Sequence, residues 1–388
     1  MNFRIARVFV IGCFLYFCYC VDAQTTPGTY KYPPKNNWIA TCMIGGKTTK
    51  HFLLLPDGTV NSFAPGEMPK PIEGLINIIA IAAGNYHMLA LNKDGTIWAW
   101  GRNNEFQLGN KSLFEFDEGS LTPVQVDNIS NAIAISAMDH TSFALLEDGT
   151  IRAWGNGNLG ITGDGKEISY AGTSSSVSGR RLPVQVQGIK DAVAISGAMA
   201  LLANGEVMTW GDGQLGRLGN GTKETSSTPV KVMGIKNAVS ISARRDGGLA
   251  LLANGEVWAW GNNYKGQLGN GATHINQGDH SSVPVKVIGI KNAVAIDAGS
   301  TCFVLLKDGV LMGWGWGEIG ALGSRAREVT STPLKIPGIS NAIGIKSGNG
   351  SGFALLADGT VMGWGANMVA KGTYHQSYVP IKITQVTL

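Results

Sequence analysis

Histidine is the residue type in this chain best suited to metal binding or proton transfer, but the spacing of the six histidines predicts neither. They are spread over different parts of the sequence, at His51, His87, His140, His274, His280 and His375. Only His274 and His280 lie close together, with Asp279 beside one of them, in a polar segment. A weak metal site there is one hypothesis, and solvated loop histidines are the favoured alternative. We expect His87 to serve as a structural hydrogen-bonding residue.

Other catalytic patterns are missing from the sequence. It contains no G-x-S-x-G, H-E-x-x-H or C-x-x-C motif and no phosphate-binding loop. The segment 163–167 (GDGKE) resembles the start of a calcium loop but does not have the spaced oxygen ligands that such loops need. We therefore predict a protein that is not an enzyme and that has no cofactor and no metal.

The first 23 residues have the features of a secretory signal peptide. Arg4 and Arg7 precede an apolar run of twelve residues (8–19), and small residues before Ala23 suit cleavage after that position. An uncleaved membrane anchor is the alternative, although the run is shorter than the roughly 20 residues that span a bilayer. The chain then divides into a signal peptide (1–23), a linker (24–36) and one domain (37–388), and we expect a secreted or periplasmic location.

Few cysteines remain after such a cleavage. Two of the five, Cys42 and Cys302, would stay in the mature chain, and they lie in different repeats. A bridge needs Cα atoms within roughly 7 Å, so we expect buried free thiols. The net charge of +4 over 388 residues is too small to predict nucleic-acid binding.

A unit that occurs seven times dominates the sequence. Its core is an Asp-Gly or Asn-Gly pair followed by an alternating stretch that ends in Trp-Gly, at 94–101, 148–155, 204–211, 254–261, 308–315 and 358–365. A divergent copy (57–64) has Phe63 in place of Trp. Asp-Gly and Asn-Gly between apolar runs predict tight β-hairpins, because both turn residues need a positive φ.

Each unit predicts four short strands. An apolar run precedes the hairpin, the Trp-Gly stretch follows it, and segments of the types NAVAI and TPVKV lie upstream. Small Ala alternating with Val or Ile in the NAVAI segment suits a crowded position near a central axis. The repeats therefore predict an all-β fold, a seven-bladed β-propeller of four-stranded antiparallel blades.

The Trp-Gly pairs are expected to form the core between blades, with the glycine allowing the backbone to turn. They are Trp100, Trp154, Trp210, Trp260, Trp314 and Trp364, followed by Gly101, Gly155, Gly211, Gly261, Gly315 and Gly365. The chain ends in a TPVKV-like segment (378–388) and the domain begins with a NAVAI-like one at Trp38. We therefore expect the C-terminal strand to join the N-terminal blade and close the ring.

The repeat closely resembles that of the regulator of chromosome condensation family. The resemblance covers residues 37–388 and depends on the DG-x-[VI]-x-x-WG core and on a G-Q-L-G run at 266–269, with looser copies at 106–109, 216–219 and 320–323. It implies a seven-bladed propeller. The first and seventh copies have no G-Q-L-G element, and the fourth is about four residues short after Ile195.

The resemblance implies a binding platform and leaves the function open among three classes. The first is a secreted protein-binding module, including an inhibitor of an extracellular enzyme, as in a bacterial branch of the family. The second is exchange-factor activity toward a small GTPase, as in the namesake of the family. The third is carbohydrate or cell-wall binding through exposed aromatic residues. We expect a protein partner, a monomer, no nucleic acid, and no membrane contact beyond the signal peptide.

The loops that follow the Trp-Gly pairs vary in length and form the predicted binding surface. They contain the aromatic and arginine residues that dominate interface energies: Phe106, Phe114, Phe116, Tyr170, Arg180, Arg181, Tyr264, Trp316, Arg325, Arg327, Tyr374 and Tyr378. The alternative is that these side chains pack their own loops. Turns at 85–87, 139–140 and 244–246 are expected on the opposite rim as a competing surface.

Overall fold

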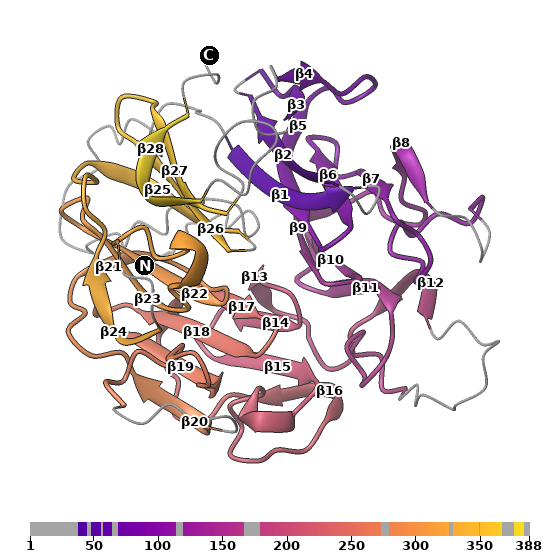
Figure 1. Ribbon diagram of the computed structural model, residues 1–388. Helices are drawn as coiled ribbons and strands as arrows, with labels where there is room; N and C mark the ends of the chain where they lie inside the picture. Colours follow the sequence, from indigo (N-terminus) through magenta and orange to yellow (C-terminus); the bar gives the residue numbers. More distant parts are fainter. Residues whose placement is uncertain are drawn as a thin grey trace, which may run out of the picture.

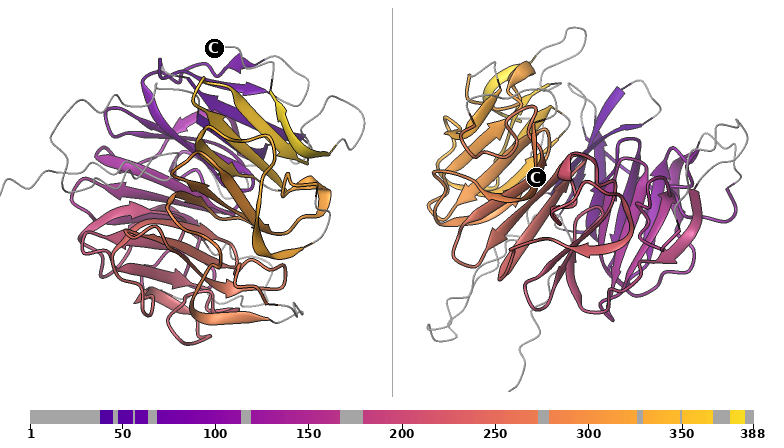
Figure 2. Two further views of the ribbon diagram at one scale, coloured as in Figure 1. Left: turned by 90° about the vertical axis from the view of Figure 1, so that its left-hand side faces the viewer. Right: turned by 90° about the horizontal axis from the view of Figure 1, so that it is seen from below.

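The computed structural model describes residues 38–44, 48–55, 57–63, 69–113, 119–166, 179–272, 279–325, 329–348, 350–366 and 376–383, with side chains from residue 50 onward. The expected signal peptide and linker lie outside these residues. Seven four-stranded antiparallel sheets surround a common axis (Figure 1), which confirms the predicted seven-bladed propeller. Figure 2 gives two further views of the ring.

Blades 1 to 4 are formed by consecutive strands. Blade 1 comprises β1 (Trp38–Ile44), β2 (Thr48–Leu54), β3 (Val60–Phe63) and β4 (Lys70–Pro71). Blade 2 comprises β5 (Ile78–Ala83), β6 (His87–Asn92), β7 (Ile97–Gly101) and β8 (Ser120–Gln125). Blade 3 comprises β9 (Ala132–Met138), β10 (Thr141–Leu146), β11 (Ile151–Asn156) and β12 (Gly179–Gln185). Blade 4 comprises β13 (Ala192–Ile195), β14 (Met199–Leu202), β15 (Val207–Gly211) and β16 (Ser226–Lys231).

Blades 5 to 7 follow the same order. Blade 5 comprises β17 (Ala238–Arg244), β18 (Gly247–Leu252), β19 (Val257–Asn262) and β20 (His280–Lys286). Blade 6 comprises β21 (Ala293–Asp297), β22 (Thr301–Leu306), β23 (Leu311–Gly315) and β24 (Thr330–Lys335). Blade 7 comprises β25 (Ala342–Ser347), β26 (Ser351–Leu356), β27 (Val361–Gly365) and β28 (Ser377–Lys382). Two short 3-10 helices, η1 (Gln214–Gly216) and η2 (Glu318–Gly320), lie in the loops of blades 4 and 6, and no helix in the described part of the chain is long and apolar enough to cross a membrane.

The six tryptophans fill the spaces between blades, as predicted, and each is at most 2% exposed. Five of them donate an indole N–H bond to a backbone carbonyl in the loop of the preceding blade: Trp154 to Gln107 (3.0 Å), Trp210 to Ile161 (2.9 Å), Trp260 to Arg217 (3.1 Å), Trp314 to Gln267 (2.9 Å) and Trp364 to Ala321 (3.1 Å). The G-Q-L-G element and its looser copies therefore connect one blade to the tryptophan of the next in four of these five cases, and Ile161 of the segment 160–163 (GITG) does the same for Trp210.

A second set of bonds connects the innermost strands. The hydroxyl oxygens of Ser136, Ser196 and Ser242 each accept a backbone N–H from the inner hairpin of the following blade, all at 2.9 Å; the donors are Gly197, Ala243 and Ala298. In blade 6 the carboxylate of Asp297 does the same for the N–H of Ser347. These bonds run without a break from blade 3 to blade 7.

The expectation for ring closure is wrong. The C-terminal strand β28 pairs with β27 in blade 7, and blade 1 has its own fourth strand, the short β4. The two blades meet instead through side chains: Phe353 of blade 7 packs with Leu53 and Phe63, and its ring centroid lies 5.7 Å from that of His51. The repeat pattern did not predict β4, because Lys70, Pro71 and Ile72 stand where other repeats have Val-Lys-Val.

Candidate protein-binding face

The long loops and the turns of the inner hairpins lie on one rim of the ring, so the expectation that they occupy opposite rims is wrong. The backbone N–H groups of Arg102, Asn156 and Asn262, where the long loops begin, donate to carbonyls of Tyr86 (2.9 Å), His140 (3.0 Å) and Asp246 (2.8 Å) in those turns. We call this rim the loop face. The Asp-Gly and Asn-Gly hairpins and the connections between blades form the opposite rim, the hairpin face.

The glycine after each tryptophan allows this close approach. Gly101 has φ of +107°, and a Cβ there would lie 2.4 Å from the carbonyl oxygen of Tyr86. Any larger residue would separate the long loop from the inner turn. The packing role predicted for these glycines is confirmed at this position.

Polar and aromatic side chains connect blades 2 and 3 on the loop face. The guanidinium of Arg102 lies 4.5 Å from the ring centroid of Tyr86, whose ring is 5.3 Å from that of His140. Beside them the side-chain amide of Asn85 donates to the carboxylate of Asp139 at 2.8 Å. These residues come from loops anchored on neighbouring blades, so their positions are set by the ring.

Blade 4 has a shorter inner hairpin than its neighbours, as the sequence predicted. Strands β13 and β14 are four residues each, and Gly197 and Ala198 alone form their turn. Across the short hairpin of blade 4, Arg245 of blade 5 pairs with Asp139 of blade 3, with 3.8 Å between Nε and the carboxylate. The Arg245 side chain is 78% exposed, so it is available to another molecule.

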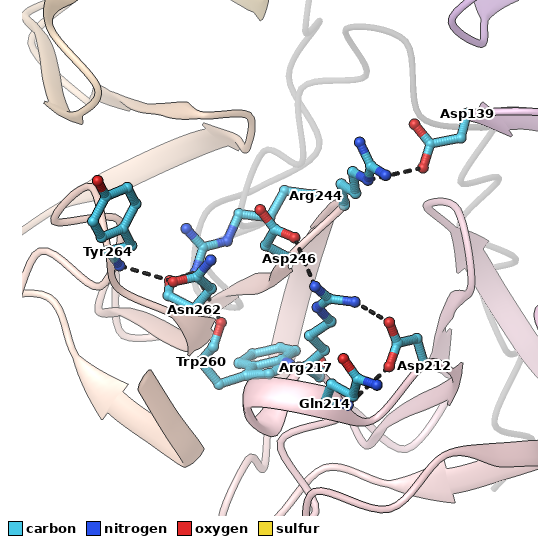
Figure 3. A network of polar contacts seen from close by, with 10 residues as sticks. Asp139, Asp212, Gln214, Arg217, Arg244, Asp246, Trp260, Asn262 and Tyr264 are labelled. Atoms are coloured by element: carbon cyan, nitrogen blue, oxygen red, sulfur yellow. Dashed lines mark hydrogen bonds and ion pairs between the residues drawn. The ribbon is translucent and has the colours of Figure 1, made fainter. Parts of the chain in front are cut away.

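A network of charged residues lies between blades 4 and 5 (Figure 3). Arg217 pairs with Asp212 and, at 3.2 Å, with Asp246. Arg244 is buried beside them, and its Nη2 donates to the carbonyls of Trp260 and Asn262, both at 3.0 Å. At the rim of this network Tyr264 is 47% exposed, while its backbone N–H donates to the side chain of Asn262 at 2.8 Å.

Two buried titratable groups support blade junctions and not a reactive site. The Nε2 of His87 lies 2.8 Å from Ser142 Oγ, and because that hydroxyl donates to the carbonyl of Gln107, His87 carries its proton on Nε2. Burial, with a smaller contribution from His140, lowers the pKa of His87 to about 3, so the ring is neutral. The structural role expected for His87 is confirmed. Cys302 is free and buried, as expected, and burial raises its pKa.

The predicted binding residues separate into three groups. Phe114, Phe116, Tyr170, Arg327 and Tyr374 lie outside the described residues. A second group packs against its own blade or a neighbouring one: Phe106, Arg180, Arg181, Trp316 and Tyr378. Arg180 and Tyr378 contact their own blade, as the alternative interpretation expected, whereas the partners of Arg181 and Trp316 lie in the loop of the preceding blade. The third group, Tyr264 and Arg325, is exposed.

The contacts of the second group are specific. Phe106 is 4% exposed at φ +63°, the place where four other repeats have glycine, so the structure corrects its expected exposure. Arg180 pairs with Asp164 at 2.6 Å, and Arg181 donates to the carbonyls of Leu113 (3.1 Å) and Lys111. The ammonium of Lys265 covers Trp316 at 4.3 Å, and Tyr378 donates to Gln376 at 2.7 Å.

Sequence reasoning missed Asp212 and Arg217 and treated Arg245 only as part of a competing rim. A signal was present for Arg217, since the other repeats have Gln107, Ile161, Gln267 or Ala321 at that position. The described residues contain no group of three His, Cys, Asp or Glu side chains able to hold a metal. Asp164, from the suspected calcium loop, is bound by Arg180, and His274 lies outside the described residues.

Comparison with known proteins agrees with the architecture. Residues 46–386 match the RCC1-like domain family. The probable E3 ubiquitin-protein ligase HERC6 of Homo sapiens is 34% identical over 182 residues, which is 44% of this chain and 17% of that protein. The regulator of chromosome condensation of Drosophila melanogaster is 35% identical over 160 residues, 38% of this chain and 26% of that protein. The matched segments thus cover about a quarter or less of these relatives.

Solved structures share the fold. Human WBSCR16 superimposes with a TM-score of 0.69 at 22% identity, covering 81% of this chain and 84% of that one. Prp20p of Saccharomyces cerevisiae gives 0.69 and 22% over 81% of this chain and 80% of that one. With a family match across nearly the whole propeller, this chain belongs to the RCC1-like domain family.

Proposed function

We propose that this chain is an exported protein-binding propeller that holds a protein partner on its loop face. Export is expected from the signal peptide, so the partner is an extracellular or periplasmic protein. An enzyme kept in an inhibited complex is the specific form that we expect.

The observation that carries the proposal is the gathering of long loops and inner turns on a single rim. That rim presents Arg245 and Tyr264, an exposed arginine and an exposed tyrosine, on a turn and a loop of blade 5 that the hydrogen bond from Asn262 to Asp246 joins. Arginine and tyrosine are enriched among residues that dominate binding energy. A rigid scaffold reduces the entropy lost on binding.

The test is crosslinking of the tagged, exported full-length chain in its own medium, followed by quantitative mass spectrometry. The double variant Arg245→Glu/Tyr264→Ala should lose the partner that the wild type captures. The matched control Lys93→Glu/Ile76→Ala also changes an exposed cation and an exposed apolar residue, but on the hairpin face, and should retain it. Capture of no protein, or equal loss in both variants, would rule out the proposal.

Nucleotide exchange on a small GTPase is the second candidate. It is supported by the 35% identity to the Drosophila regulator of chromosome condensation. The assay is release of a fluorescent guanine nucleotide from a panel of small GTPases, and an absence of acceleration across the panel removes this candidate. Carbohydrate binding has weaker support, because Lys265 covers the ring of Trp316; a glycan array without signal would end it.

A further inference from the structure

The hairpin face has a different charge on different blades. The hairpins of blades 4 and 5 have Asn204 and Asn254 where five other blades have aspartate. The asparagines keep the turn, since Asn204 Oδ1 accepts the N–H of Glu206 at 2.9 Å, as Asp94 Oδ1 accepts that of Thr96 at 2.9 Å. The turn geometry is therefore conserved between these blades while one negative charge per hairpin is absent.

Lysines accumulate on the same two blades. Their hairpins and outgoing connections (203–206, 231–237, 253–256 and 286–292) contain four lysines and two glutamates. The equivalent segments of blades 2 and 3 (93–96, 125–131, 147–150 and 185–191) contain two lysines and five acidic residues. One sector of the hairpin face is therefore basic, and its neighbour is acidic.

Two of these four lysines, Lys231 and Lys286, form ion pairs, and the other two, Lys236 and Lys291, form none within 4 Å in the described part of the chain. Lys231 bonds to Glu206, and Lys286 bonds to Glu256. Lys236 also acts on Glu206, because its charge helps to lower the pKa of that carboxyl after the larger effect of Lys231. The hairpin and outgoing connection of each blade thus contain two lysines and one glutamate, which is one positive charge in excess.

Adjacent blades hold these groups side by side. The carbonyl of Gly205 accepts the N–H of Ala238 at 3.1 Å, and the carbonyl of Gly255 accepts that of Ala293 at 3.2 Å, so each hairpin contacts the connection to the next blade. Lys236 and Lys291 occupy the same position in consecutive connections, and both are exposed.

An exposed apolar side chain stands between the two lysines of each blade. Met233 is 51% exposed between Lys231 and Lys236, and Ile288 is 42% exposed between Lys286 and Lys291. The order Lys-Val-(Met or Ile)-Gly-Ile-Lys therefore occurs twice in succession around the ring. A matching ligand needs negative charges with an apolar residue among them, repeated along its length.

We propose that the hairpin face of blades 4 and 5 binds an acidic protein segment containing interspersed apolar residues, at a site separate from the loop face. The free charges of Lys236 and Lys291 attract its carboxylates, and Met233 and Ile288 contact its apolar side chains. Binding weakens as salt rises, because these lysines are exposed and screened.

The probe is a fluorescein-labelled peptide of four Asp-Glu-Leu-Glu units, measured by fluorescence anisotropy with the full mature chain. The comparison peptide replaces the acids with Asn and Gln. We expect Lys236→Glu/Lys291→Glu to weaken binding about tenfold or more. The control Lys93→Glu/Lys382→Glu changes the net charge equally at exposed positions of blades 2 and 7, away from blades 4 and 5, and should bind as the wild type does.

Three results would overturn this assignment. They are no binding of the acidic peptide, equal binding of the neutral peptide, and equal weakening in both double variants. Sedimentation that revealed a salt-sensitive dimer displaced by the peptide would assign the sector to a second copy of the chain instead. The variant Arg245→Glu should leave peptide binding unchanged, so failure here and failure of the loop-face proposal are distinguishable.

Discussion

Replacing Gly109 with alanine tests the contact that fastens blade 2 to blade 3. Gly109 has φ of +62°, and a Cβ there would lie 2.6 Å from Trp154 Nε1 and 2.7 Å from its Cδ1. The indole would have to move and would lose its bond to the carbonyl of Gln107. A buried donor without a partner costs about 1–3 kcal/mol, and the left-handed backbone adds about 1–2 kcal/mol.

A matched control separates these two costs. Gly188 has φ of +72°, and a Cβ at that position meets nothing within 4 Å. Gly188→Ala should therefore lose only the free energy that the left-handed backbone costs. The free energy of unfolding of Gly109→Ala should be lower than that of Gly188→Ala by about 1–3 kcal/mol. Thermal unfolding, followed by tryptophan fluorescence and circular dichroism, should give Gly109→Ala a Tm a few degrees below that of Gly188→Ala. Equal Tm values for the two variants would refute the proposed role of the loop–tryptophan contact.

Three further predictions follow from single sites. Arg245→Ala should change the free energy of unfolding by less than about 1 kcal/mol, since its pair with Asp139 is exposed; a larger loss would contradict this. His87 has a folded pKa near 3, below its unfolded value of about 6.5, so its contribution to the free energy of unfolding is fully present above pH 6.5 and is lost as the pH drops toward 3. At pH 5 the expected loss of stability is about 2 kcal/mol. His87→Gln should flatten a plot of Tm against pH in that range, and an unchanged slope would count against the buried neutral ring. Cys302 should react with iodoacetamide only after denaturation, because the thiol is fully buried. Labelling of the Cys302 peptide in the native protein, detected by mass spectrometry, would contradict this.

The repeat core was predictable because each signal is local. Asp-Gly and Asn-Gly hairpins, alternating strands and Trp-Gly pairs depend on residues a few positions apart, and all seven blades follow from them. The shared rim was also deducible: antiparallel strands reverse direction at each turn, so the first turn and the last loop of a blade must lie at the same end. The opposite-rim expectation neglected that rule.

The features that could not be predicted from the sequence depend on contacts between blades. Ser136, Ser196 and Ser242 are ordinary small residues in or directly after a strand, and only the approach of the next blade makes them hydrogen-bond acceptors. Burial of Phe106 and the covering of Trp316 by Lys265 likewise depend on how long loops fold back. Exposure of an aromatic residue cannot be deduced from its place in a variable loop.

The side-chain closure between blades 7 and 1 has an evolutionary consequence. Each sheet is encoded by one uninterrupted stretch of sequence, and the tryptophans recur every 50 to 56 residues. Duplication or deletion of one such stretch in a gene would therefore add or remove a whole blade without separating paired strands. The contacts of Phe353 with Leu53 and Phe63 would be the ones that must adjust, so blade number in such a ring is open to change through recombination.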